Sequence, residues 1–202
     1  MNTTQEKTIA TASLEAKAFH ALLSGALTHS GKDESLPRLF GVYLWREGGK
    51  IKAVSTDRYR LIVGEIESEG EGESSPVRLS YDDAKALVST LSKEKKGFSR
   101  VEITLAGDIL SAKVGASSLT FTTYADELPP YAHLFPQEGA EPMAMPHVSF
   151  NPLFFADYGK IAGKRGQVTV RQYGENKAFE IVLGGDLEKV TWRALLMPMR
   201  VR

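Results

Sequence analysis

The order strand, helix, strand, strand, strand recurs three times along the chain, and this repetition constrains the fold more than any other feature. Apolar residues at three- and four-residue spacing predict helices over residues 14–27, 81–92 and 153–162. Runs rich in β-branched and aromatic residues, separated by glycine turns, predict one strand before each helix and three after it. Each such unit places a helix on one face of an antiparallel sheet and needs a neighbour to complete its core. The pattern therefore predicts an α+β fold built from three similar units.

Links rich in glycine, serine and proline divide the chain into two domains of unequal size. An acidic stretch, residues 68–75, separates a first unit (8–67) from a second (76–136), and the two together are expected to form one complete domain, 8–136. A connector with five prolines follows, and the third unit, 143–202, is expected to be half a domain. This half domain must pair its sheet edge with another chain or leave strands exposed.

Polar residues before each predicted helix indicate where that helix begins. Ser13 is a candidate N-cap for the first helix, because short polar side chains accept hydrogen bonds from the free backbone N–H groups there. Ser80 and Asp83 have the spacing of a capping box. Asn151 followed by Pro152 combines a capping amide with a proline at the first helical position. We expect each helix to begin directly after its cap.

The bulk composition excludes several classes of protein. The chain of 202 residues has 25 Lys plus Arg and 25 Asp plus Glu, so any positive charge that meets nucleic acid must be placed locally. It has no cysteine, which excludes disulfides and thiolate metal sites and is compatible with a reducing cytoplasm. No apolar stretch approaches the roughly 20 residues of a membrane span. We expect a cytoplasmic protein without a membrane partner.

Signatures of catalysis and of cofactor binding are missing from the sequence. The four histidines are scattered, and no HExxH, GxSxG, GxxxxGK[ST] or GxGxxG motif occurs. Asp57 lies between a strand and the arginines Arg58 and Arg60, where local hydrogen bonds and ion pairs favour a turn residue over a catalytic acid. We therefore expect a protein that is not an enzyme and that needs no metal or cofactor.

The last eight residues form an apolar run that is interrupted by Pro198. Because proline cannot donate to a sheet ladder, a strand in this run can extend only to about Met197. Beyond it, Met199 suits an adaptable apolar pocket for the side chains of a partner. The alternative is that the tail only packs into the body of the protein as its last strand. The pattern alone leaves both interpretations open.

Basic residues gather on and after the predicted helices. A solvated helix face would explain them, and so would a surface that follows DNA phosphates without reading bases. The candidate DNA-facing residues are Lys17, Lys85, Lys93, Lys95, Lys96, Lys160, Lys164 and Arg165.

Three stretches together resemble the bacterial DNA polymerase III beta sliding clamps, the processivity subunits of the replicative polymerase. Residues 55–61, Ser-Thr-Asp-Arg-Tyr-Arg-Leu, resemble the T-D-G-H-R-L loop of that family. Residues 128–136, which begin Leu-Pro-Pro-Tyr and end Leu-Phe-Pro, resemble the F-P-D-Y segment that closes a clamp domain. Residues 196–201, Leu-Met-Pro-Met-Arg-Val, resemble the C-terminal V-M-P-M-R-L. The three occur in the order of the family and span almost the whole chain.

The resemblance implies a DNA-clamp fold and a function. The chain would be a short, divergent clamp, of the kind that a phage or mobile element encodes, with three units where the family has six. Its helices would line the hole of a homo-oligomeric ring around duplex DNA, with four chains if the usual number of units is kept. A clamp-derived adaptor or transcription accessory that forms no ring is the alternative.

The same resemblance implies a pocket for peptides of the replicative polymerase and of other partners, among them a clamp loader. Leu61, Pro136, Met197 and Met199 would form an apolar floor, and Arg60 and Arg200 a polar rim. Arg58 and Tyr59 depart from the family loop, and they put the choice of peptide in question. The implied pocket residues are Leu39, Thr56, Arg58, Tyr59, Arg60, Leu61, Pro136, Leu195, Met197, Pro198, Met199, Arg200 and Val201.

Overall fold

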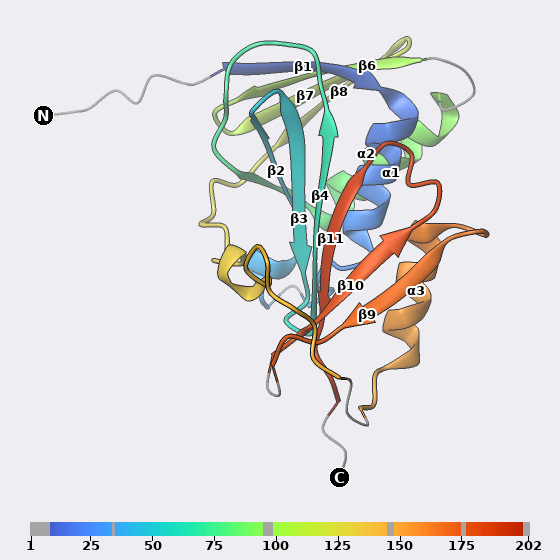
Figure 1. The fold of residues 1–202 in the computed structure, drawn as a ribbon. Helices are drawn as coiled ribbons and strands as arrows, with labels where there is room; N and C mark the ends of the chain where they lie inside the picture. Colours follow the sequence, from blue (N-terminus) through green and yellow to red (C-terminus); the bar gives the residue numbers. More distant parts are fainter. Residues whose placement is uncertain (1–8, 34, 95–98, 145–147, 175–176, 200–202) are drawn as a thin grey trace, which may run out of the picture.

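A computed structural model describes residues 9–33, 35–94, 99–144, 148–174 and 177–199 of the chain. These residues form two antiparallel sheets with three α-helices on one side of them (Figure 1). The prediction of an α+β fold, with helices against antiparallel sheets, is therefore confirmed.

The predicted order of elements is present in the first two units. The first unit comprises β1 (Ile9–Glu15), α1 (Ala16–Leu27), β2 (Gly41–Glu47), β3 (Lys50–Thr56) and β4 (Arg60–Glu67). The second comprises β5 (Val77–Ser80), α2 (Tyr81–Glu94), β6 (Arg100–Ala106), β7 (Ile109–Val114) and β8 (Ser117–Thr122). Short 3₁₀ helices, η1 (Pro37–Leu39) and η2 (Ala132–Leu134), lie in the connections after α1 and after β8.

The third unit keeps the helix and the three strands that follow it. It comprises α3 (Pro152–Ala162), β9 (Gln167–Arg171), β10 (Phe179–Gly184) and β11 (Thr191–Leu196). The strand expected over 147–150 is reduced to one isolated bridge, between Ser149 and Met199. His147 lies outside the described residues.

Two of the three predicted helix caps are confirmed. The backbone N–H of Asp83 donates to the Ser80 hydroxyl at 3.1 Å, and that hydroxyl donates to the Asp83 carboxylate at 2.6 Å. The Asn151 side chain accepts from the backbone N–H of Leu153 at 3.0 Å. The Ser13 cap is wrong, because β1 continues past it and pairs with β6 as far as Glu15. Pairing with a distant strand here outweighs the local capping preference.

The first two units exchange their first strands. The four-stranded sheet has the order β1-β6-β7-β8, so the first strand of unit one lies in the sheet of unit two. The seven-stranded sheet has the order β5-β2-β3-β4-β11-β10-β9, so the first strand of unit two lies beside β2. Because α1 also packs against α2, these two units share one core.

The third unit joins the first through a ladder between β4 and β11. The register runs antiparallel from Arg60 opposite Leu196 to Glu65 opposite Thr191. Trp192 of β11 packs against both the core of the first two units and the core around Tyr158 in the third. The aromatic ring therefore packs into both cores at the joint.

Gly64 makes room for the Trp192 ring, whereas Gly159 has open space around it. Alanine should therefore have opposite effects at these two positions. A Cβ on Gly64 would lie 2.5 Å from the Trp192 ring and 2.6 Å from Leu22, whereas a Cβ on helical Gly159 meets nothing within 4 Å. We expect Gly64→Ala to lower the free energy of unfolding by about 1–3 kcal/mol. Gly159→Ala should leave it unchanged or raise it by up to about 1 kcal/mol. Urea unfolding measures both, and equal effects would contradict the close packing at Trp192.

Candidate functional site

A cavity of about 380 Å³ lies where the loop after β3, the short helix η2 and the end of β11 meet. Its floor is apolar and includes Leu61, Leu195 and Met197, and the cations Arg58 and Lys177 lie at its exposed side. We call it the tail cavity. It is lined by Thr56, Arg58, Tyr59, Arg60, Leu61, His133, Leu134, Lys177, Ala178, Leu195 and Met197.

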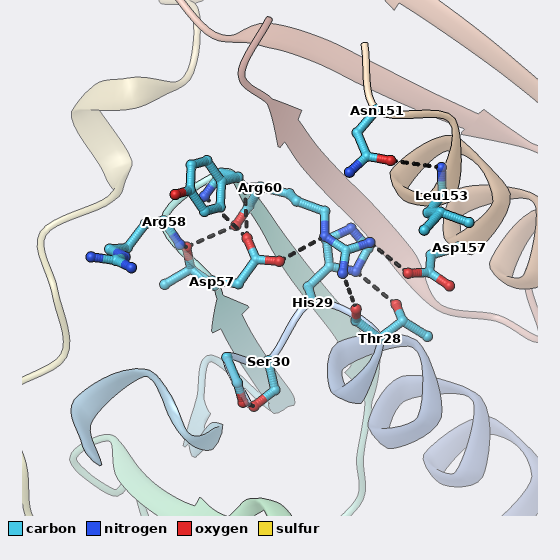
Figure 2. Close-up of polar contacts among 12 residues, drawn as sticks. Thr28, His29, Ser30, Asp57, Arg58, Arg60, Asn151, Leu153 and Asp157 are labelled. Carbon is cyan, nitrogen blue, oxygen red and sulfur yellow. Dashed lines mark hydrogen bonds and ion pairs between the residues drawn. The ribbon is translucent and has the colours of Figure 1, made fainter. Parts of the chain in front are cut away.

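The loop beside the tail cavity is held by side-chain hydrogen bonds to its own backbone. The Asp57 carboxylate accepts from the backbone N–H groups of Tyr59 and Arg60, at 3.1 and 3.0 Å (Figure 2). The Thr56 hydroxyl accepts from the N–H of Arg58 at 3.2 Å and donates to the carbonyl of Arg60 at 2.8 Å. The prediction that Asp57 is a turn residue is confirmed. These bonds hold Arg58 at a φ of +77°.

Arg60 does not form the exposed rim that the sequence suggested. Its side chain is only 6% exposed and forms ion pairs with Asp57 at 2.9 Å and with Asp157 of α3 at 2.6 Å (Figure 2). A third bond, of 2.6 Å, goes to the carbonyl of Thr28 at the end of α1, and the guanidinium lies 4.2 Å from the ring centroid of Phe154. Arg60 therefore ties the loop to two helices and is not free to rim a pocket.

The chain after β11 passes along this loop and then reaches the segment before α3. The backbone N–H of Met197 donates to the carbonyl of Tyr59, and that of Met199 donates to the carbonyl of Ser149, both at 2.8 Å. The regular ladder ends at Leu196, as Pro198 predicts. The Met197 and Met199 side chains are 42% and 53% exposed. The tail thus contributes packing up to Leu196 and exposed apolar surface after it.

Of the eleven implied pocket residues that the structure describes, seven line the tail cavity and four do not. Leu39 instead lines a second cavity, of about 500 Å³, on the side of the loop that faces Phe154. Pro136 follows Phe135, whose ring is buried with Leu61 and Leu195. Pro198 and Met199 do not line the tail cavity. Arg200 and Val201 lie outside the described residues.

Sequence reasoning missed four lining residues, which come from the short helix η2 and from the connection before β10. His133 and Leu134 belong to η2, and Leu134 was already part of the stretch that resembles a domain-closing segment. Lys177 and Ala178 precede β10, and no sequence signal placed them beside the loop.

The candidate DNA-facing residues are on or after the three helices, which cover one side of the sheets (Figure 1). Two of them are neutralised, because Lys17 pairs with Glu188 at 2.8 Å and Lys160 pairs with Asp157 at 2.6 Å. Lys95 and Lys96 lie outside the described residues. Within the described ranges, no ion pair is seen for the remaining four: Lys85, Lys93, Lys164 and Arg165.

Buried ionisable groups lie beneath the loop. His29 is fully buried with its Nδ1 2.7 Å from the Thr28 hydroxyl, and burial and the nearby Arg60 guanidinium lower its pKa to about 3. Burial also raises the pKa of Tyr158, whose hydroxyl donates to the carbonyl of Leu195 at 3.0 Å. Burial opposes ionisation of Asp157, but hydrogen bonds from Lys160 and Arg60 keep the pKa of this carboxyl below its usual value. These groups hold the fold together beneath the cavity.

Within the part of the chain that the structure describes, no cluster of three or more His, Cys, Asp or Glu side chains could hold a metal ion. Among the same residues no helix is long and apolar enough to cross a membrane.

Comparison with known proteins relates the chain to bacterial sliding clamps. It is 29% identical over 132 residues to the beta sliding clamp homolog GriR of Streptomyces muensis, covering 62% of this chain and 34% of the relative. It is 31% identical over 140 residues to the beta sliding clamp of Streptomyces coelicolor, covering 64% and 35%. The matched region is therefore about a third of the length of these relatives. No family model matches the chain.

The fold is that of a sliding clamp. The crystal structure of the DNA polymerase sliding clamp from Caulobacter crescentus superposes with a TM-score of 0.76 at 19% identity, over 100% of this chain and 68% of that one. The family resemblance that the three sequence stretches suggested is confirmed in sequence and in fold.

The buried His29 predicts how stability depends on pH. Its folded pKa of about 3 lies below the ordinary 6.5, so the unfolded chain binds a proton that the folded chain does not. The stability that the neutral imidazole contributes to the folded chain is complete above pH 6.5 and is lost as the pH falls toward 3. Between pH 6.5 and 4.5 the free energy of unfolding of the wild type should fall by about 2 kcal/mol more than that of His29→Gln. Urea unfolding at both pH values measures the difference, and parallel losses would contradict a neutral buried imidazole.

Proposed function

We propose that this chain, which has the fold of the bacterial beta sliding clamps, works as a short clamp that holds partner proteins on DNA. It would form a homo-oligomeric ring around duplex DNA and tether the replicative polymerase through peptide segments bound in the tail cavity. Residues 8–136 would be one clamp-like domain and 143–202 half of another. The observation that carries this proposal is the cavity itself, where the loop after β3, the short helix η2 and the end of β11 meet.

The lining of the tail cavity suits a short peptide with one or two large apolar anchors. Leu61, Leu134 and Met197 offer an apolar floor, and methionine adapts to different side chains. A volume of about 380 Å³ is at the lower end of ligand sites. Burying a leucine and a phenylalanine contributes a few kcal/mol, which supports roughly micromolar binding. Arg58 and Lys177 would favour negative charge beside the anchors.

The helix side of the molecule supplies the surface for DNA. Cations such as Lys85 and Lys93 on α2, for which the described residues show no ion pair, can meet phosphates without contacting bases. A ring that slides needs such loose, water-mediated contacts and not tight ones. This role is binding and not catalysis, takes place in the cytoplasm, and leaves room for a clamp loader. Four chains would close a ring with the usual number of units.

A second function is favoured by the ion pairs on the same helix side. Lys17 and Lys160 are matched by Glu188 and Asp157, which lowers the positive potential there. A clamp-derived adaptor that binds partner peptides without encircling DNA would need no more charge than this. Light scattering separates the two functions, because a strict monomer at high concentration cannot form the ring.

We expect Met197→Asp to weaken binding of a labelled peptide with leucine and phenylalanine anchors by at least tenfold. The side chain is 42% exposed and lines the tail cavity, so an aspartate there is tolerated by the fold but unfavourable beside an apolar anchor. Ile9→Asp is the matched control, since Ile9 is 59% exposed and does not line the cavity. Fluorescence anisotropy gives both affinities. Equal affinities for the two variants would contradict the assignment of the cavity.

We expect removal of the α2 cations to change how DNA binding responds to salt. Replacing Lys85 and Lys93 with glutamine should reduce the slope of log K against log salt concentration by about 1 for each phosphate that the variant no longer neutralises. The control replaces Lys50 and Lys52 of β3, which form ion pairs with carboxylates on the sheet. Titrations of duplex DNA at several salt concentrations give the slopes. An unchanged slope in the α2 variant would exclude this helix from the DNA surface.

A further inference from the structure

A further cavity, of about 390 Å³, lies at the joint between the first and third units. It opens where α1, α3 and the turn between β10 and β11 meet, and it shares no residue with the tail cavity. We call it the joint cavity. Its volume is within the range of sites for small molecules. It therefore has room for a ligand that is separate from any peptide in the tail cavity.

One wall of the joint cavity is apolar and fixed in position. Ala21 of α1, Ile161 of α3 and Leu187 of the turn line it, and each is only partly buried against the two cores. Trp192 completes this wall. Because a Cβ on Gly25 would lie 2.6 Å from its six-membered ring, the indole is packed too closely against α1 to move aside. The wall is thus preformed, and a flat apolar group can cover side chains that the fold leaves partly exposed.

The other end of the joint cavity carries an excess of negative charge. Asp186 is exposed, and among the described residues no cation forms an ion pair with it. Glu188 pairs with Lys17 at 2.8 Å. Lys160 is the lysine of the lining, and it pairs with Asp157 at 2.6 Å. With its histidine neutral, the lining has two carboxylates against one cation, and the two outside partners cancel each other.

The turn that supplies the carboxylates keeps a strained backbone. Glu188 and Lys189 have φ values of +51° and +65°, which residues with a Cβ rarely adopt. The pair of Glu188 with Lys17 ties the turn to α1. A second pair, of 2.5 Å, joins Lys189 to Glu15 at the end of β1. Strain of this kind persists only where the surroundings impose it, and it gathers at ligand sites. The turn therefore holds its carboxylates in place beside the apolar wall.

We propose that the joint cavity binds a small aromatic amine. The ring of the amine lies against Ile161, Leu187 and Trp192, and its ammonium group faces Asp186 and Glu188. Burial of the ring supplies most of the affinity, because an ammonium beside exposed carboxylates contributes little. An anion of the same shape meets the excess of carboxylates and binds less tightly. The site stands independently of the function proposed for the tail cavity.

The first test uses phenethylamine as the probe and hydrocinnamate, which has a similar ring and chain with a carboxylate, as its matched control. The chain has two tryptophans, so a heteronuclear NMR spectrum contains two indole N–H signals, and Trp45→Phe assigns them. Phenethylamine should shift the signal of Trp192, which lines the cavity, and not that of Trp45. It should bind about threefold more tightly than hydrocinnamate. Absence of a shift, equal shifts of both signals, or equal affinities of the two probes would overturn the proposal.

The second test changes the two ends of the cavity separately. Asp186→Asn should weaken phenethylamine about threefold and leave hydrocinnamate no weaker. Glu138→Gln is the matched control, since Glu138 is also exposed but does not line the cavity. Ala21→Phe fills the cavity from α1 and should abolish binding of both probes. Asp186 is exposed and its variant keeps the fold, so an unchanged affinity for Asp186→Asn overturns the proposal even where Ala21→Phe unfolds the chain.

Competition with the labelled peptide separates the joint cavity from the tail cavity. The two share no residue, so saturating phenethylamine should leave the peptide bound. Displacement of the peptide would place the amine in the tail cavity and overturn the proposal. A chain that binds phenethylamine and not the peptide would instead refute the proposed peptide pocket and support the joint cavity.

Discussion

The buried guanidinium of Arg60 is the interaction on which the candidate site depends. A charge that is 6% exposed is tolerated only where acceptors surround it, and here they come from Asp57, Asp157 and the carbonyl of Thr28. These acceptors belong to the loop, to α3 and to the end of α1. Loss of any one of these acceptors would leave the buried guanidinium without one of its hydrogen-bond partners. The requirement therefore fixes the loop against two helices and shapes the wall of the tail cavity before any ligand arrives.

Local patterns in the sequence predicted the features that depend on residues nearby in the chain. They failed where contacts with distant segments determine the structure. The caps at Ser80 and Asn151 follow from hydrogen bonds within three residues, and the end of the ladder before Pro198 follows from a missing N–H. The Ser13 cap failed because β6 pairs past it. Arg60 was placed on a rim because sequence reveals its charge, whereas its burial depends on Asp157, 97 residues away. Lys177 and Ala178 reach the cavity only through the β10–β11 pairing, which no local signal contains.

Arg58 shows how the loop can vary without losing its shape. Its φ of +77° is a backbone conformation that suits glycine, which the related loops have at this position, and a residue with a Cβ carries a strain of about 1–2 kcal/mol there. Two side chains, Thr56 and Asp57, bond the loop backbone on both sides and keep it in place. The strain is thus offset locally, and the longer side chain adds a cation beside the cavity. A residue other than glycine at this position therefore changes the charge beside the cavity, while Thr56 and Asp57 hold the loop backbone.

The third unit has a smaller and more open core than the one that the first two units share. Its core has seven buried apolar residues with eight others only partly buried around them, against 26 and six in the core that the first two units share. A unit of this kind in the first 136 residues is completed by a second helix and an exchanged strand. Within the described residues the third unit has one helix, α3, and its sheet ends at β9, so these two elements border a core that is less completely enclosed.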